Sequence, residues 1–281
     1  MDAEVTTVRG VEIPTVGLGT WRLAGWDCRR AVRTALELGY RHVDTAQAYG
    51  NERQVGSALG EAAVDREEVF VTTKLGRDSR GYDAVRRSVE ESLAKLGTDY
   101  VDLLLIHWPN LTTPLRETLA AMNELVDAGK VRHVGVSNFD LGRLARAREL
   151  SEHGILTNQI QYNPYWSQTG LLDYCRIHDV ALTAYSPLAH GGVLDDPVLE
   201  AIGARYDKTA AQVALRWLVQ QPNVLTVPKA SSREHLAENL AVFDFELTDE
   251  EMDRIYRPSK ARAMTGFLKG RLRSVRDACP L

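Results

Sequence analysis

Residues 101–107 read Val-Asp-Leu-Leu-Leu-Ile-His, an almost unbroken apolar run that ends on an imidazole. A short run without strict alternation of polar and apolar residues is typical of a strand that is buried on both faces. Such strands belong to parallel sheets whose faces are covered by helices. The stretch therefore favours an α/β fold and places His107 at the carboxyl end of a buried strand.

Segments of similar character recur along the chain and alternate with amphipathic, helix-like stretches. We expect strands near residues 16–20, 42–46, 69–73, 101–107, 133–137, 157–162, 181–186 and 224–228. Strands that alternate with helices in this way predict a (β/α)8 TIM barrel. The stretch Thr7–Ile13, with Arg9-Gly10 at its middle, predicts a hairpin that caps the barrel floor.

Three local signals define helix ends. Val89, Leu93 and Leu96 recur at helical spacing, and the following Gly97 predicts a helix stop. Asn51 is expected to cap the helix that starts at Glu52. The sequence Thr-Asp-Glu-Glu at 248–251 has the form of a capping box.

A doubly wound dinucleotide fold is the competing α/β architecture. It requires Gly-x-Gly-x-x-Gly between the first strand and the first helix. Residues 17–22 read Gly-Leu-Gly-Thr-Trp-Arg and lack the third glycine. If the chain binds a nucleotide, we expect it to do so in another way.

Composition limits the class of protein. The chain has 281 residues and a net charge of -4, so we expect a single domain over 1–281 and no nucleic-acid partner. It contains neither a membrane-length apolar run nor a signal-peptide pattern. Cys28, Cys175 and Cys279 are widely spaced and predict free thiols, without a disulfide framework or a metal site. We therefore expect a cytoplasmic monomer.

The charge is unevenly distributed. Residues 257–281 carry a net charge of about +6, against about -10 for the preceding body. One interpretation is a solvated tail. The other is a flap over the barrel mouth that meets an anionic substrate or cofactor phosphates, which would make the kinetics depend on salt.

Four chemically active side chains lie at or just beyond three consecutive strand ends: Asp44, Tyr49, Lys74 and His107. In a parallel barrel, the carboxyl ends of the strands form the catalytic face. A free phenol has a pKa of about 10, and an adjacent ammonium lowers it. We expect Lys74 to act on Tyr49 in this way, Asp44 to hold Lys74 in its charged form, and His107 to orient a substrate carbonyl. The set suggests a proton donor placed beside a carbonyl group.

The segments that carry these residues closely resemble the aldo-keto reductases. The motifs are His-Val-Asp-Thr-Ala-x-x-Tyr-Gly-Asn-Glu, Ile-His-Trp-Pro, Gly-Val-Ser-Asn-Phe and Val-Pro-Lys, and the resemblance spans about residues 5–256. It implies an NAD(P)H-dependent carbonyl reductase in which Asp44, Tyr49, Lys74 and His107 are the catalytic residues. The subgroup most similar to this chain is that of the bacterial 2,5-diketogluconate and small-aldehyde reductases.

The resemblance also implies a site for NADPH. Ser137, Asn138 and Gln159 would bind the nicotinamide carboxamide, and Tyr185 would stack on its ring. Ser186 and Leu188 would line the path of the pyrophosphate. Lys229 would meet the 2′-phosphate, and Glu238 and Asn239 would contact the adenine. Ser231 and His235, in the same segment, would also bind this end of the cofactor. Ser137 and Asn138 also have a structural interpretation, because either residue could cap the helix expected after them.

Two positions depart from the family pattern. Ala230 stands where a serine is common, and His235 stands where an arginine is common. An arginine binds phosphate through two hydrogen bonds and stays charged, whereas an imidazole is largely neutral at pH 7. We therefore expect a weaker preference for NADPH and use of NADH as well, unless Arg233 compensates.

Trp21 and Trp108 follow strand ends and are expected to wall the substrate pocket, although each could instead fill the core. The loop from Trp108 to Pro114 is short, which favours an open site for small aldehydes, methylglyoxal-like dicarbonyls and keto sugars. Two alternatives remain. One is a regulatory barrel that senses NADP(H) with little turnover, and the other is a lyase that forms a Schiff base on Lys74.

Overall fold

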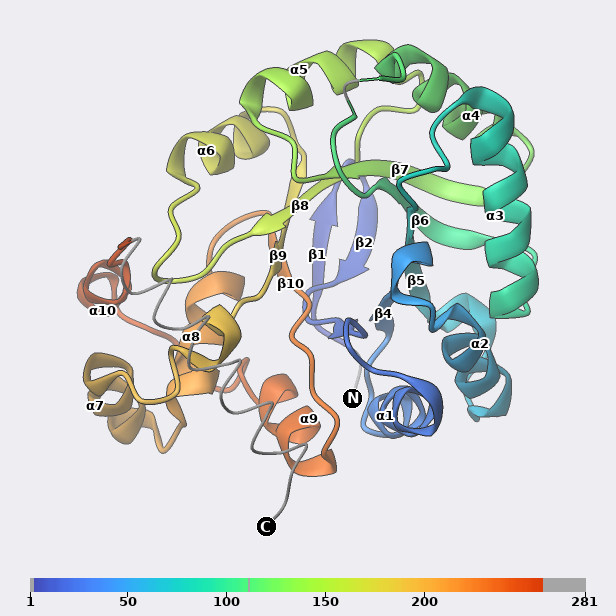
Figure 1. Ribbon diagram of the computed structural model, residues 1–281. Coiled ribbons are helices and arrows are strands. Elements are labelled where there is room, and N and C mark those ends of the chain that lie inside the picture. The colour runs from blue at the N-terminus through green and yellow to red at the C-terminus, as the bar shows by residue number, and fades with distance from the viewer. Residues whose placement is uncertain (1–2, 111, 260–281) are drawn as a thin grey trace.

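The computed structural model describes residues 3–110 and 112–259, and a single eight-stranded parallel sheet organises them (Figure 1). The strand order is β10-β9-β8-β7-β6-β5-β4-β3, so every neighbour in space is a neighbour in sequence. The strands are β3 (Leu18–Gly19), β4 (His42–Asp44), β5 (Phe70–Leu75), β6 (Val101–Ile106), β7 (Val131–Ser137), β8 (Thr157–Gln161), β9 (Ala181–Tyr185) and β10 (Val224–Thr226). All eight predicted strands are confirmed.

Backbone bonds between the two outermost strands close this sheet into a barrel. Val16 bridges Thr226 in parallel, and Gly19 N–H donates to the Pro228 carbonyl at 3.0 Å. A Cβ on Gly19 would lie 2.5 Å from the Val227 carbonyl oxygen, so this close approach requires glycine. The glycine that resembled part of a dinucleotide loop therefore serves barrel closure.

Helices form the outer ring seen in Figure 1. They are α1 (Gly25–Glu37), α2 (Glu52–Glu61), α3 (Tyr82–Leu96), α4 (Leu115–Asp127), α5 (Leu141–Leu150), α6 (Thr169–Ile177), α7 (Pro197–Tyr206), α8 (Ala210–Val219), α9 (Arg233–Leu240) and α10 (Asp249–Ile255). Three 3-10 turns add η1 (Gln47–Tyr49), η2 (Arg66–Glu68) and η3 (Ala189–Gly191). Among the described helices, none is long and apolar enough to cross a membrane.

The floor of the barrel is closed by the predicted hairpin. Strands β1 (Val5–Val8) and β2 (Val11–Pro14) pair antiparallel around Arg9 and Gly10, which both have positive φ. Figure 1 shows this hairpin crossing the centre of the ring. Val8 and Ile13 pack with Leu103, Leu105 and Leu225 in a second, smaller core inside the barrel. The apolar floor leaves the opposite end of the strands for polar side chains.

The positions of the three predicted helix signals are confirmed. Gly97 ends α3 in the left-handed conformation, and Thr248 forms a capping box with Glu251. Asn51 is the N-cap residue of α2, as predicted, but its side chain makes no capping hydrogen bond. Its amide instead donates to the carbonyls of Thr20 and Leu23, each at 2.9 Å. Asn51 thus ties the loop after β3 to the start of α2.

The tail interpretation can be followed only at its beginning. Arg257 donates to Asp196 at 2.7 Å, and its backbone N–H donates to the Pro164 carbonyl. Residues 260–281, which carry most of the basic charge and the expected flap, lie outside the described residues.

Candidate active site

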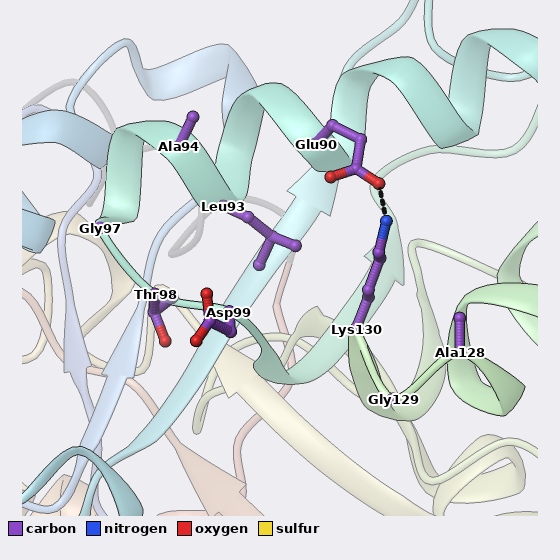
Figure 2. Close-up of a pocket in the computed structure, with 9 residues that line it drawn as sticks. All are labelled: Glu90, Leu93, Ala94, Gly97, Thr98, Asp99, Ala128, Gly129 and Lys130. Carbon is purple, nitrogen blue, oxygen red and sulfur yellow. Dashed lines mark hydrogen bonds and ion pairs between the residues drawn. The ribbon is translucent and has the colours of Figure 1, made fainter.

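Two hollows stand out on the barrel, at opposite ends. The first, of about 620 Å³, lies between the end of α3 and the loop before β7. Figure 2 shows that an ion pair between Glu90 and Lys130 spans it. It faces the amino ends of β6 and β7, away from the four candidate catalytic residues. This hollow has no arrangement of side chains suited to the chemistry expected here.

The second hollow is a cavity of about 1300 Å³ at the carboxyl ends of the strands. Asp44, Tyr49 and His107 line it, together with Trp21 and Trp108. Ligand pockets of about 300–1,000 Å³ hold a small molecule. A space of this size at the catalytic end of a parallel barrel is large enough for a substrate and part of a cofactor.

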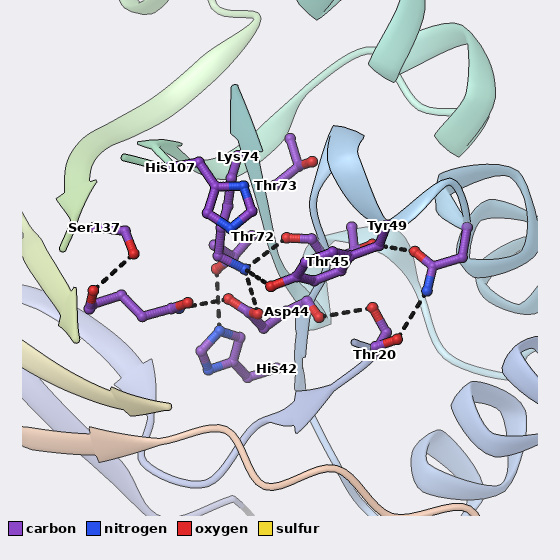
Figure 3. Close-up of polar contacts among 12 residues, drawn as sticks. Thr20, His42, Asp44, Thr45, Tyr49, Thr72, Thr73, Lys74, His107 and Ser137 are labelled. Atoms are coloured by element: carbon purple, nitrogen blue, oxygen red, sulfur yellow. Dashed lines mark hydrogen bonds and ion pairs between the residues drawn. The ribbon is translucent and has the colours of Figure 1, made fainter. Parts of the chain in front are cut away.

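Lys74 is the centre of a buried polar cluster that reaches this cavity through Asp44 and Tyr49 (Figure 3). Its side chain is completely buried, and its ammonium donates to Asp44 Oδ1 at 2.5 Å and to the Thr45 carbonyl at 2.8 Å. It also lies 3.4 Å from the Tyr49 hydroxyl. The structure therefore brings together Asp44 at the end of β4, Tyr49 at the end of η1 and Lys74 on β5.

The pKa values of this cluster follow from burial and from charge. Burial lowers the pKa of Lys74, but Asp44 and Tyr49 outweigh it, and the net pKa is raised. For Tyr49, burial raises the pKa more than the Lys74 ammonium lowers it. The prediction of a lowered pKa for Tyr49 is therefore wrong in net sign, although Lys74 acts in the expected direction. Tyr49 is a protonated phenol at neutral pH.

His107 completes the group. Its ring lies 5.7 Å from the Tyr49 ring, edge to face, and 6.4 Å from the Trp108 ring. Burial and the Lys74 charge lower the pKa of His107 to about 4. The imidazole is consequently neutral at pH 7 and can donate one hydrogen bond without adding a charge to the cavity.

The opposite wall of the cavity carries amides and hydroxyls. Ser137 Oγ donates to the Gln159 carbonyl at 2.8 Å, and the Tyr185 hydroxyl donates to Asn138 Oδ1 at 2.8 Å. Asn138 Nδ2 donates to the His107 carbonyl at 2.9 Å and to Ser137 Oγ at 3.0 Å. Gln159 Nε2 reaches across to Asp44 Oδ2 at 2.7 Å.

The capping interpretation of Ser137 and Asn138 is wrong. The N-cap of α5 is Asp140, whose side chain accepts from Arg143 N–H. Asn138 itself has a positive φ of 63°, which turns its amide toward Tyr185 and His107. Both residues thus belong to the cavity wall.

Comparison with known proteins shows the family to which this chain belongs. The family model described as Aldo/keto reductase family matches residues 15–258. A 9,11-endoperoxide prostaglandin H2 reductase of Trypanosoma cruzi is 41% identical over 89% of each chain, and a glyoxal reductase of Bacillus subtilis is 40% identical over 88% of this chain and 89% of its own.

The chain is an aldo-keto reductase.

Solved structures agree with this assignment. A proposed 2,5-diketo-D-gluconic acid reductase B is 48% identical over 90% of both chains, with a TM-score of 0.89. An aldo-keto reductase of Bombyx mori, solved in complex with NADP, is 37% identical over 91% of this chain and 92% of its own, with a TM-score of 0.84. The protein is therefore an oxidoreductase that reduces carbonyl compounds, in a family that binds NADP(H).

The remaining predicted cofactor residues of this aldo-keto reductase fall into two sets. Ser186, Leu188 and Lys229 line the cavity. Four others lie on the loop and helix that follow Lys229, outside the cavity lining: Ser231, His235, Glu238 and Asn239. Ser231 and His235 are exposed, whereas Glu238 is half-buried and Asn239 is buried.

Both tryptophans lie in the reductase cavity and not in the core. Trp21 is 42% exposed and Trp108 is 43% exposed, so the core-filling interpretation is wrong. The Arg22 guanidinium lies over the Trp21 ring at 4.2 Å, and His190 approaches the ring edge at 6.1 Å.

Sequence reasoning missed Gln47 and Arg77. Both line the cavity, and Gln47 Oε1 accepts from Gly76 N–H at 2.6 Å. Only their positions in the sequence could have indicated these residues: Gln47 is two residues before Tyr49, and Arg77 is three residues after Lys74. Neither residue belongs to the motifs that identified the family.

Proposed function

We propose that this reductase transfers hydride from a reduced nicotinamide cofactor to small aldehydes, dicarbonyls and keto sugars, with Tyr49 as the proton donor. The observation that carries the proposal is the position of the Lys74 ammonium, 2.5 Å from Asp44 and 3.4 Å from the Tyr49 hydroxyl. When Tyr49 gives its proton to the carbonyl oxygen, negative charge develops on the phenol oxygen. Lys74 stabilises that charge, and Asp44 keeps Lys74 protonated.

His107 is assigned the task of orienting the substrate. A neutral imidazole can donate an N–H to the carbonyl oxygen while Tyr49 approaches the same atom. The edge-to-face contact of the two rings at 5.7 Å supports this arrangement. Trp21 and Trp108 would then enclose the rest of the substrate.

The cofactor, when bound, supplies the hydride. We assign the nicotinamide end to the wall of Ser137, Asn138, Gln159 and Tyr185. Both N–H groups of Asn138 are already donated, to His107 and to Ser137. No described residue engages Gln159 Oε1. Asn138 Oδ1 accepts from the Tyr185 hydroxyl and has a second lone pair, so it and Gln159 Oε1 are suited to accept from the carboxamide N–H groups.

The phosphate-bearing half is assigned to Ser186, Leu188 and Lys229, and beyond them to Ser231, His235, Glu238 and Asn239. NADPH is the expected cofactor, as in the relative solved with NADP. Use of NADH as well is proposed because His235 supplies no permanent charge for a 2′-phosphate. Arg233 is paired with Glu37, to which it donates at 3.1 Å, and this pair offsets part of the charge that Arg233 could offer to a 2′-phosphate.

The lyase alternative is disfavoured by the state of Lys74. A Schiff base needs a neutral amine, and the net pKa of this buried lysine is raised through Asp44 and Tyr49 despite the opposing effect of burial. We also propose that the chain forms one barrel domain. Its cytoplasmic location and monomeric state remain predictions.

The test is consumption of NADPH and of NADH with methylglyoxal, glyoxal and butanal, followed by nicotinamide absorbance. Cofactor binding is measured in parallel from quenching of tryptophan fluorescence. Turnover with NADPH supports the reductase. Binding of NADPH without turnover of any of the three carbonyls would support the cofactor-sensing alternative instead.

A further inference from the structure

The loop after β5, residues 76–81, brings arginine to the substrate side of the cavity. Arg77 is exposed and lines the cavity with His107 and Trp108. Arg80, at the far end of the same loop, is 7% exposed. The nicotinamide wall comes from β7, β8 and β9, so this loop borders the other half of the barrel mouth, beside β4 and β6.

Both ends of the loop are held in place. Gly76 N–H donates to Gln47 Oε1 at 2.6 Å, and Gln47 Nε2 donates to the Ser88 carbonyl and to Ser92 Oγ, each at 3.1 Å. At the other end, Thr118 Oγ1 donates to the Arg80 carbonyl at 2.6 Å. Because Gln47 begins the turn that ends at Tyr49, the loop backbone is fixed relative to the proposed proton donor.

The charge of Arg77 is not neutralised by an ion pair with any described residue. Asp78 is exposed beside Arg77 and lines the same cavity. The two other acids on this side of the cavity are paired with lysines: Asp44 with Lys74, and Glu91 with Lys95 at 3.8 Å. The pKa of His107 is lowered mainly by burial and by Lys74. Arg80 and Arg77 lower it further, by smaller amounts. Three positive charges, those of Lys74, Arg80 and Arg77, therefore act on His107 against one negative charge, that of Asp44.

We propose that Arg77 is a specificity-determining residue that selects carbonyl substrates bearing a carboxylate. A guanidinium presents two parallel N–H donors that match the two carboxylate oxygens, and it keeps its charge at every working pH. Arg80, buried at the far end of the same loop, adds a second positive charge near His107. The inference deepens the proposed function, on which it rests, by naming the charge of the substrate.

The test compares two aldehydes that differ almost only in charge, 4-formylbenzoate and its methyl ester. Wild type, Arg77→Gln and Arg77→Glu are assayed with saturating NADPH, and Arg86→Gln is the matched control. Arg86 pairs with Glu124 on the outer helices and lies outside the cavity lining, so its loss changes the net charge equally.

We expect Arg77→Gln to lower kcat/KM for 4-formylbenzoate by about 5- to 30-fold, mostly through KM, because an exposed charge pair is weaker than a buried one. Arg77→Glu should lower it further. The methyl ester should change by less than about 2-fold in both variants, and Arg86→Gln should leave both aldehydes unchanged. The wild-type preference for the carboxylate should also weaken as salt is added.

Three outcomes would overturn the inference. One is an equal effect of Arg77→Gln on the acid and on its ester. Another is an increase in the KM for NADPH with no change for the aldehydes, which would assign Arg77 to the cofactor. The third is wild-type turnover of the ester without any preference for the acid. If wild type turns over neither aldehyde nor the uncharged carbonyls, the proposed function itself fails.

Discussion

Gln159 and Asp44, which are 115 positions apart in the chain, are joined by a hydrogen bond of 2.7 Å across the barrel mouth. The other oxygen of Asp44 accepts from Lys74 at 2.5 Å. One carboxylate thus connects the amide wall to the buried ammonium beside Tyr49. Asp44 therefore fixes the geometry between the two halves of the proposed site.

Removing one partner of the buried Asp44–Lys74 pair should destabilise the folded protein. Asp44→Asn leaves the Lys74 ammonium without a counter-ion, and Lys74→Met leaves the carboxylate without one. We expect each change to lower the free energy of unfolding by about 3–5 kcal/mol. The double variant should lose clearly less than the sum, because it contains neither unpaired charge. Urea denaturation of the four proteins measures the coupling, and additive losses would contradict it.

The lowered pKa of His107 predicts a pH dependence of stability. Its pKa is about 4 in the folded protein and about 6.5 in the unfolded chain, so the unfolded state binds more protons between these values. Stability contributed by His107 is therefore complete above pH 6.5 and is lost as the pH falls toward 4.

His107→Gln should remove that contribution. As the pH is lowered from 7 to 4.5, we expect wild type to lose more unfolding free energy than His107→Gln does. Burial also lowers the pKa of His42, but His42 is present in both proteins. The difference between the two proteins therefore reports on His107 alone. A difference that is independent of pH would mean that His107 titrates normally.

Asn51 is predicted to stabilise the fold through the loop that carries Trp21. It is 1% exposed, accepts from Thr45 Oγ1 at 2.7 Å and donates to the carbonyls of Thr20 and Leu23. Asn51→Ala should cost about 2–4 kcal/mol, because it leaves buried carbonyls unpaired. Asn51→Asp should cost more, since a carboxylate would face two carbonyl oxygens. Thermal or urea unfolding decides the order, and equal stability of Asn51→Asp and wild type would exclude this role.

His235→Arg should strengthen the preference for NADPH. The His235 side chain is exposed at the first turn of α9, where its backbone N–H already donates to Ser232 Oγ, so a longer side chain fits without loss of packing. We expect the NADPH/NADH ratio of kcat/KM to rise by about 5- to 20-fold, through charge-assisted bonds to the 2′-phosphate. Lys229→Met is the converse variant and should lower the ratio. An unchanged ratio in His235→Arg would show that position 235 does not meet the phosphate.

The fold could be predicted from the sequence because burial on both faces leaves a continuous apolar run in each strand. The candidate catalytic residues could then be predicted from their places at the strand ends, because the ends of parallel strands meet on one face. The errors have physical causes. Asn51 occupies the cap position, but its Oδ1, the atom that could cap α2, accepts from Thr45 Oγ1 at 2.7 Å, while its Nδ2 donates to the Thr20 and Leu23 carbonyls. The net pKa of Tyr49 depends on burial, which spacing along the chain does not reveal.

Arg77 and Gln47 were missed for a related reason. The loop after β5 has no regular structure, and its role depends on the bond from Gly76 N–H to Gln47, 29 positions earlier. Local spacing does not encode a contact between residues this far apart in the chain. Local sequence patterns therefore predicted the residues at the strand ends and not those that the loops bring beside them.

Tyr49→Phe tests most directly whether Tyr49 donates the proton. The variant keeps the ring that packs against His107 and removes only the hydroxyl 3.4 Å from Lys74. We predict that kcat for methylglyoxal with NADPH falls by at least about 10²- to 10⁴-fold, the usual contribution of a general acid. NADPH binding, measured by fluorescence, should stay within about 2-fold. Turnover within about tenfold of wild type would contradict the assignment.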